Sequence, residues 1–133
     1  QCKSLFPFPI YPMNYVSNEK ELVDIYNAVD LYVTPSLQDN LPNTIVEAMA
    51  CGIPCVGFNV GGIPQMIDHL HNGYVAQYKS ADDLANGICW TLTEGDYETL
   101  SSEAYRKAVT TYSEATVASQ YIQIYNHITE KNA

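Results

Sequence analysis

Hydrophobic residues along this chain occur in two alternating arrangements: short apolar runs and longer segments with helical spacing. The apolar runs at residues 31–34, 54–58 and 73–76 predict three short buried strands. Helical spacing predicts helices at residues 19–28, 44–51, 63–68, 96–111 and 113–131, and another that Ser80 opens. Strands that alternate with helices, without hairpin signatures, predict βαβ units and a parallel sheet covered on both faces.

The helix that Ser80 opens starts with a capping-box pattern, because an acidic residue follows three positions later. Its predicted core face repeats at helical spacing at Leu84, Ile88 and Leu92. Gly87 lies inside this helix and weakens it by up to ~1 kcal/mol relative to Ala. Tertiary packing is expected to offset that cost.

The closing helix carries an apolar stripe. Val117, Tyr121, Ile124 and Ile128 follow the spacing i, i+4, i+7 and i+11. Such a stripe is typical of an amphipathic helix that docks on another surface.

Composition narrows the choice of partners. At 133 residues the chain is one domain or less. Acidic residues outnumber basic ones 15 to 6, which gives a formal net charge of −9 and argues against nucleic-acid or anionic-membrane partners. No Lys or Arg occurs from position 21 to position 78, so backbone amides must supply this segment's own contacts to any bound diphosphate.

The four cysteines, Cys2, Cys51, Cys55 and Cys89, fit no metal-ligand spacing. The sequence shows no signal peptide and no apolar run near the ~20 residues that span a bilayer. We therefore expect free thiols, no bound metal, no transmembrane segment and a cytoplasmic location.

The segment 36–57 holds the strongest candidate chemistry. It joins the end of one predicted strand to a loop with Asp39, a helix with Glu47 and the next strand. Two carboxylates at such a junction can face one polar ligand. Unpaired N–H groups and the helix dipole at the helix start favour a phosphate there, which suits a sugar nucleotide.

Each of these residues also has a structural interpretation. Residues 44–47 form a capping-box sequence in which Glu47 reaches back to the Thr44 N–H. Asp39 fits an Asx-turn. Gly61 and Gly62 fit either a sharp turn or a close approach of a ligand to the backbone.

Residues 26–36, 39–47 and 47–54 resemble the C-terminal domain of retaining glycosyltransferases of family 4, also called group 1. The sequences Gly61-Gly62-Ile63-Pro64 and Tyr112-Ser113 are similar to further family landmarks. The resemblance implies the GT-B architecture, in which two Rossmann-like domains face each other across a cleft. The expected fold class is therefore α/β, a Rossmann-like parallel sheet flanked by helices in the C-terminal half of a GT-B fold.

The family pairs two Glu residues separated by seven others. The resemblance implies that Glu47 binds the ribose hydroxyls and that Asp39, which stands where the family usually has Glu, contacts the transferred sugar as the catalytic residue. Asp is one methylene shorter, so its reach differs from the family pattern. The remaining implied donor-binding residues are Asn40, Leu41, Asn43, Thr44, Gly61 and Gly62. Helix geometry independently supports ligand binding at the helix start, because the first backbone N–H groups of a helix have no acceptor within it.

The resemblance also implies an activity: retaining, metal-independent transfer of a sugar from a UDP- or GDP-sugar to a glycan or lipid-linked acceptor, in polysaccharide or glycoconjugate biosynthesis. Family members commonly have an Arg and a Lys ahead of this region, and neither is in place here. We therefore expect residues 1–133 to be a single partial domain. The acceptor-binding N-terminal domain is then missing, the piece alone is inactive, and the full-length parent is cytoplasmic or at the membrane periphery.

Two other functions stay open. A sugar-nucleotide epimerase of similar fold would bind a nucleotide but no acceptor. A non-catalytic α/β interaction module would use the acidic surface and exposed tyrosines. Dinucleotide and ATP sites are disfavoured, because neither a Gly-x-Gly-x-x-Gly nor a Walker A sequence occurs.

Overall fold

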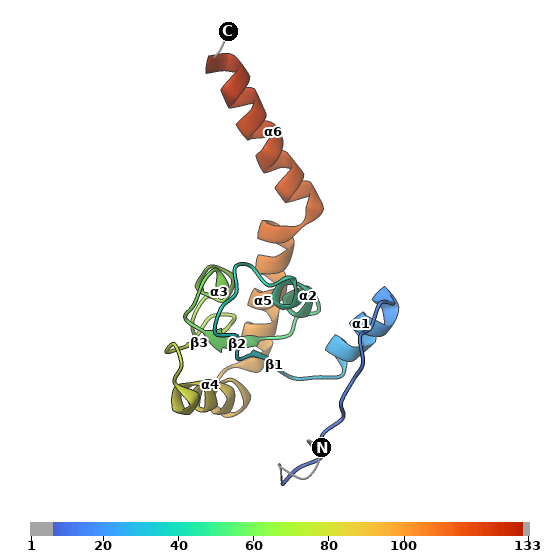
Figure 1. Ribbon diagram of the computed structural model, residues 1–133, viewed down its shortest axis with the longest axis vertical. Helices are drawn as coiled ribbons and strands as arrows, with labels where there is room; N and C mark the ends of the chain where they lie inside the picture. The colour runs from blue at the N-terminus through green and yellow to red at the C-terminus, as the bar shows by residue number, and fades with distance from the viewer. Residues whose placement is uncertain (1–6, 132–133) are drawn as a thin grey trace.

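The computed structural model describes residues 7–131. Its elements in chain order are α1 (Glu19–Asn27), β1 (Tyr32–Thr34), α2 (Asn43–Ala50), β2 (Cys55–Phe58), α3 (Ile63–Met66), β3 (Gly73–Ala76), α4 (Ala81–Thr93), α5 (Tyr97–Tyr112) and α6 (Glu114–Lys131) (Figure 1). The predicted alternation of strands and helices is confirmed, with bounds that agree to within two residues.

The three strands form one parallel sheet in the order β1-β2-β3. Val56 of the central strand lies opposite Val33 of β1 and Tyr74 of β3. All four residues of β2 are buried, as expected for a strand covered on both faces. Because the strands are parallel, the loops that follow all three lie at one edge of the sheet, where ligands of such folds bind.

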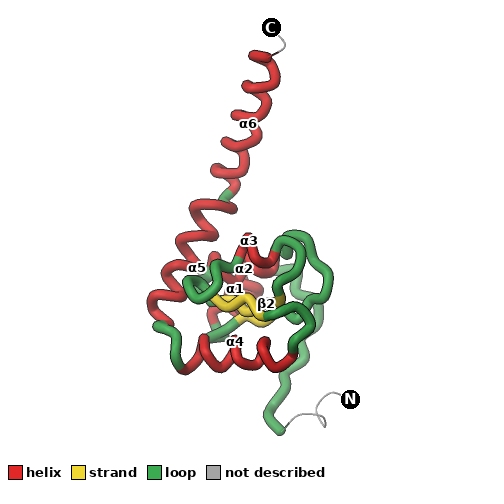
Figure 2. Tube along the Cα trace, turned by 90° about the vertical axis from the view of Figure 1, so that its left-hand side faces the viewer, coloured by secondary structure: helices red, strands yellow, loops and turns green. Residues whose placement is uncertain are grey.

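Helices cover both faces of the sheet (Figure 2). α4 packs on β2 and β3 from one side, whereas α2 and α3 pack on β2 from the other, with α5 against α2. The core on the α2 side is built from fully buried side chains, namely Ile45, Met49, Cys55, Ile63 and Met66.

Cys51, Cys55 and Cys89 are free thiols, and Cys2 lies outside the described residues.

The predicted core face of α4 is wrong at one end. Leu92 is 51% exposed, whereas Gly87 and Thr91 are buried. A methyl group at Gly87 would overlap the ring of Tyr74 in β3, so the missing side chain lets the helix approach that ring. The helix therefore packs on the sheet through the face that carries Gly87 and Thr91, and Leu92 is left at the surface.

Gly87→Ala is therefore expected to lower the free energy of unfolding by about 1 kcal/mol, although Ala is the better helix former. Overpacking costs about 1–3 kcal/mol and the gain in propensity is about 1 kcal/mol. The ring of Tyr74 cannot move freely, because its hydroxyl donates to Asp83 at 2.9 Å. Urea unfolding measures the effect. Asn86→Ala, at an exposed position of the same helix, is the control, and equal stabilisation by both changes would contradict the packing argument.

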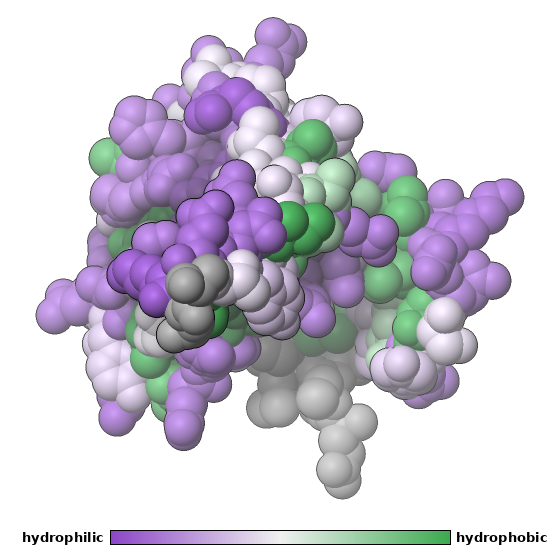
Figure 3. All heavy atoms as spheres, turned by 90° about the horizontal axis from the view of Figure 1, so that it is seen from above, coloured by the Kyte–Doolittle hydropathy of each residue, from purple (hydrophilic) through white to green (hydrophobic). Residues whose placement is uncertain are grey.

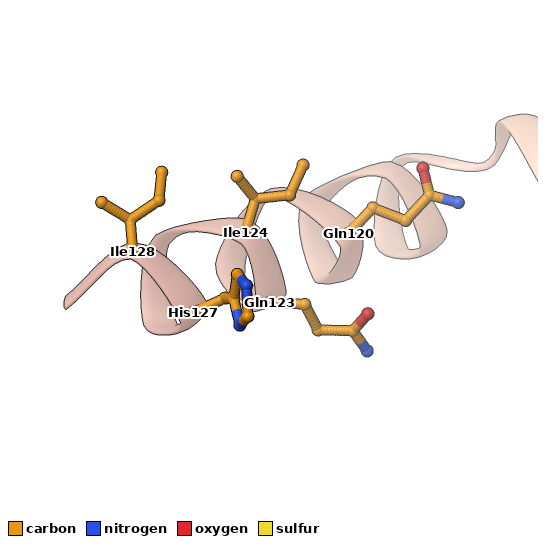
Figure 4. A pocket seen from close by; sticks show the side chains of 5 residues that line it. All are labelled: Gln120, Gln123, Ile124, His127 and Ile128. Carbon is orange, nitrogen blue, oxygen red and sulfur yellow. The ribbon is translucent and has the colours of Figure 1, made fainter. Parts of the chain in front are cut away.

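α6 extends away from the body of the molecule, and none of its residues is buried (Figure 1). Tyr121, Ile124 and Ile128 of the predicted stripe are 58%, 55% and 50% exposed. Ile124 and Ile128 project on one side of the helix, whereas Gln123 and His127 point to another (Figure 4). The stripe is present as predicted, and what it docks on stays a prediction.

Seen along α6, the surface is mainly hydrophilic, and its hydrophobic residues form separate groups, one of them over α1 (Figure 3). Within residues 7–131, no helix is long and apolar enough to cross a membrane.

Candidate functional site

The loop after β1 and the turn after β2 lie against each other at the carboxyl edge of the sheet. A methyl group at Gly61 would overlap the carbonyl oxygen of Asp39, and one at Gly62 would overlap the carbonyl oxygen of Asn40. Gly61 also has φ +56°, a left-handed conformation that favours glycine. The structure thus brings together two pairs of predicted site residues, Asp39 with Asn40 and Gly61 with Gly62, and the two pairs are more than twenty positions apart in the sequence.

This contact explains why glycines occur at the turn. The backbone of residues 39–40 occupies the space beside them. The need for two glycines thus follows from the approach of one loop to another. A direct contact between the glycines and a donor stays a prediction.

The N-terminus of α2 has no side-chain cap. Its N-cap residue is Pro42, and the helix begins at Asn43. Thr44 therefore lies inside the first turn, so the capping-box interpretation of residues 44–47 is wrong. Asn43 and Thr44 are exposed. The helix start at the sheet edge is thus exposed, and its binding of an anionic ligand stays a prediction.

Glu47 lies one turn further along α2 and is partly buried. The hydroxyl of Tyr26 donates to its Oε2 at 3.0 Å and lies 3.4 Å from the carbonyl oxygen of Thr44. The hydroxyl of Tyr32 donates to Thr44 Oγ1 at 2.8 Å. The side chains at positions 44 and 47 are thus held by two tyrosines from α1 and β1.

Sequence reasoning missed these tyrosines and assigned no role to either of them. A signal was available: a tyrosine on the apolar face of a helix still needs a partner for its hydroxyl when it is buried. Burial and the neighbouring Glu47 carboxylate raise the pKa of Tyr26 above its ordinary value. The Tyr26 phenol therefore stays a hydrogen-bond donor at neutral pH.

The two carboxylates lie in different surroundings. Glu47 lines a cavity of about 500 Å³ between α1 and α2, together with Leu22, Tyr26 and Cys51, and a second cavity beside residues 13–17. Asp39 lines neither of these two cavities and lies against the turn at Gly61. A ligand that touches both carboxylates must therefore span the open sheet edge between them, not a closed pocket.

Basic side chains near the site are few. Lys107 of α5 pairs with Asp68 at 2.6 Å. The segment after β3 contacts the loop that carries Asp39, because the Tyr78 hydroxyl donates to the carbonyl oxygen of Leu37 at 3.1 Å. Lys79 lies over the ring of Tyr78, 5.0 Å from its centre. Among the described residues, no three His, Cys, Asp or Glu side chains are grouped to hold a metal ion.

The parallel sheet, with an uncapped helix starting at its carboxyl edge, defines a Rossmann-like α/β unit. A sequence model of the family described as glycosyl transferases group 1 matches residues 9–94, more than half of the chain. The chain therefore belongs to the group 1 glycosyltransferases.

Individual relatives agree with this assignment. The chain is 28% identical over 112 residues to the N-acetyl-alpha-D-glucosaminyl L-malate synthase of Bacillus anthracis, which covers 84% of this chain and 29% of that protein. Sucrose-phosphate synthase from Thermosynechococcus elongatus matches with a TM-score of 0.74 and 26% identity, over 84% of this chain and 28% of that one. Anabaena HepE, solved in complex with UDP, matches with a TM-score of 0.71 and 27% identity, over 77% of this chain and 29% of that one. A second HepE structure is a complex with UDP-glucose.

These structural neighbours are GT-B glycosyltransferases, so the predicted α/β fold class is confirmed. The chain spans less than a third of the length of these relatives. The roles of Asp39, Glu47 and the backbone donors between them stay predictions.

Proposed function

We propose that this chain is the nucleotide-sugar-binding part of the C-terminal domain of a retaining GT-B glycosyltransferase. The whole enzyme transfers a sugar from a UDP- or GDP-sugar to a glycan or lipid-linked acceptor, in polysaccharide or glycoconjugate assembly. Support comes from the family membership and from the UDP and UDP-glucose complexes of HepE. The observation that carries the proposal in this chain is the uncapped start of α2 beside the 39–41 loop.

In this proposal the donor diphosphate lies across the start of α2. Departure of the nucleoside diphosphate builds negative charge on its oxygens, and preorganised backbone donors around Asn40, Leu41, Asn43 and Thr44 lower that barrier. Glu47 accepts hydrogen bonds from the ribose hydroxyls, and Asp39 contacts the transferred sugar. No metal is required, because helix donors and cations from other segments balance the charge.

The remaining parts of the enzyme are supplied outside this chain. We propose that residues 1–133 form one partial domain and that an N-terminal domain binds the acceptor. The exposed stripe at Tyr121, Ile124 and Ile128 is the surface of this chain that best fits such a domain. The proposed location is the cytoplasm or the membrane periphery.

Two measurements test this function. The chain is titrated with UDP and GDP by protein-observed NMR, and we expect weak binding with shifts confined to residues 39–47 and 61–62. The full-length gene product is then incubated with UDP- and GDP-sugars, and its products are analysed. A glycosylated acceptor supports the proposal. Free epimerised sugar would instead identify an epimerase, and absence of nucleotide binding in both proteins would favour a non-catalytic interaction module.

A further inference from the structure

The tyrosine contacts at α2 join three separate elements. Tyr26 comes from α1 and Tyr32 from β1, and their rings meet edge to face with centres 6.1 Å apart. Their hydroxyls bond to Glu47 and Thr44, which lie one turn apart on α2. The side chain of Glu47 is therefore held by a residue 21 positions earlier in the chain, and that of Thr44 by a residue 12 positions earlier.

Tyr26 is well suited to hold a carboxylate. It is only 7% exposed and belongs to the hydrophobic core, so the ring cannot swing away. Glu47 is partly buried and lines the cavities beside α1. A carboxylate accepts about four hydrogen bonds, and the bond from Tyr26 uses one of them on Oε2. The remaining acceptor positions are available to a ligand.

We propose that Tyr26 is a positioning residue for donor binding. Its hydroxyl holds the Glu47 carboxylate in the orientation that accepts both hydroxyls of a ribose cis-diol. This inference rests on the proposed function, because it assumes that Glu47 faces a ribonucleotide. It adds that α1 takes part in donor recognition through Tyr26, without touching the donor itself.

The test separates the ribose from the phosphates. Tyr26→Phe keeps the buried ring and removes only the hydroxyl. We expect this variant to bind UDP about tenfold more weakly than wild type. Affinity for inorganic diphosphate, which has no ribose, and for 2′-deoxy-UDP, which has no cis-diol, is expected to change much less. Tyr105→Phe, which removes an exposed hydroxyl on α5, is the matched control and is expected to leave all three affinities unchanged.

Four outcomes decide the question. A selective loss of UDP affinity in Tyr26→Phe supports the positioning role. An equal loss for all three ligands would show a general structural effect and would overturn the positioning role. Unchanged UDP affinity in Tyr26→Phe would also overturn it, if wild type still prefers UDP over its 2′-deoxy analogue. If wild type binds no ribonucleotide, the proposed function and this inference both fail.

A ligand-free measurement covers the case in which Tyr26→Phe does not fold. The ¹³Cζ chemical shift of Tyr26 reports the state of its hydroxyl bond. We expect it to move in Glu47→Gln, because a neutral amide oxygen replaces the charged acceptor. We expect it to stay in place in Glu19→Gln, which changes an exposed carboxylate lining the same cavity. An unchanged shift in Glu47→Gln would overturn the inference without bearing on nucleotide binding.

Discussion

Gly61→Ala is expected to lower the free energy of unfolding by about 3 kcal/mol. Two costs add at this position. A non-glycine residue in the left-handed conformation costs about 1–2 kcal/mol, and Gly61 has φ +56°. The new methyl group also overlaps the carbonyl oxygen of Asp39, and overpacking of this kind costs about 1–3 kcal/mol. Because the obstacle is backbone, no side-chain rotation relieves it. Chemical denaturation followed by circular dichroism measures the loss.

Gly52→Ala is the matched control for backbone strain. Gly52 has φ +74°, so it shares the left-handed conformation, but its nearest neighbour beyond the adjacent chain is the Ser101 hydroxyl, 3.0 Å from the position of a new Cβ. That hydroxyl can rotate. We therefore expect a smaller cost of about 1–2 kcal/mol, which reflects conformation alone. Equal losses in the two variants would mean that the contact between the loops at Asp39 and Gly61 contributes nothing.

The same contact ties stability to the candidate site. If the Gly61 turn is pushed away from Asp39, the 39–41 loop moves relative to the start of α2. In molecules of Gly61→Ala that remain folded, nucleotide affinity is expected to fall as well. Gly52 follows the C-terminal end of α2, opposite to the helix start, so Gly52→Ala is expected to leave affinity unchanged.

The elements of the fold were predictable because their signals are local. The three strands are compact apolar runs, and the Ser80 cap is confirmed by the bond from the Asp83 N–H to Ser80 Oγ at 3.2 Å. The face of α4 was not predictable from its own periodicity. That face is set by the ring of Tyr74, which lies across the sheet-helix interface and outweighs the apolar residue at Leu92.

The candidate site shows the same division. Family-like spacing placed Asp39, Glu47 and the glycines at one end of the sheet, and the structure brings the first of these against the turn at Gly61. The local sequence 44–47 also suggested a cap that does not form, because Pro42 takes the N-cap position instead. The bond from Tyr26 to Glu47 joins residues 21 positions apart, so no local pattern contains it.

Glu47→Gln is expected to weaken binding of UDP or GDP by roughly 1–3 kcal/mol, the range for hydrogen bonds to a charged group. Gln keeps the length of the side chain and one oxygen that can accept from Tyr26, so the fold is expected to survive. What it loses is the charge and the second acceptor oxygen that a ribose cis-diol requires. Calorimetry or an NMR titration measures the change, with inorganic diphosphate as a ligand that does not reach the ribose site.

Glu19→Gln is the control for Glu47→Gln. Glu19 lines the same cavity from α1, and the substitution removes one negative charge, as Glu47→Gln does. Both variants change the net charge from −9 to −8, so a general effect of net charge is the same in the two. The two positions differ in the bond from Tyr26, which Gln can still accept, and in the proposed contact with the ribose. We therefore expect Glu19→Gln to bind UDP like wild type or slightly better, since one negative charge near an anionic ligand is gone. If Glu47→Gln behaved in the same way, the ribose-binding role of Glu47 would be wrong, and recognition would have to rest on the helix start and the 39–41 loop.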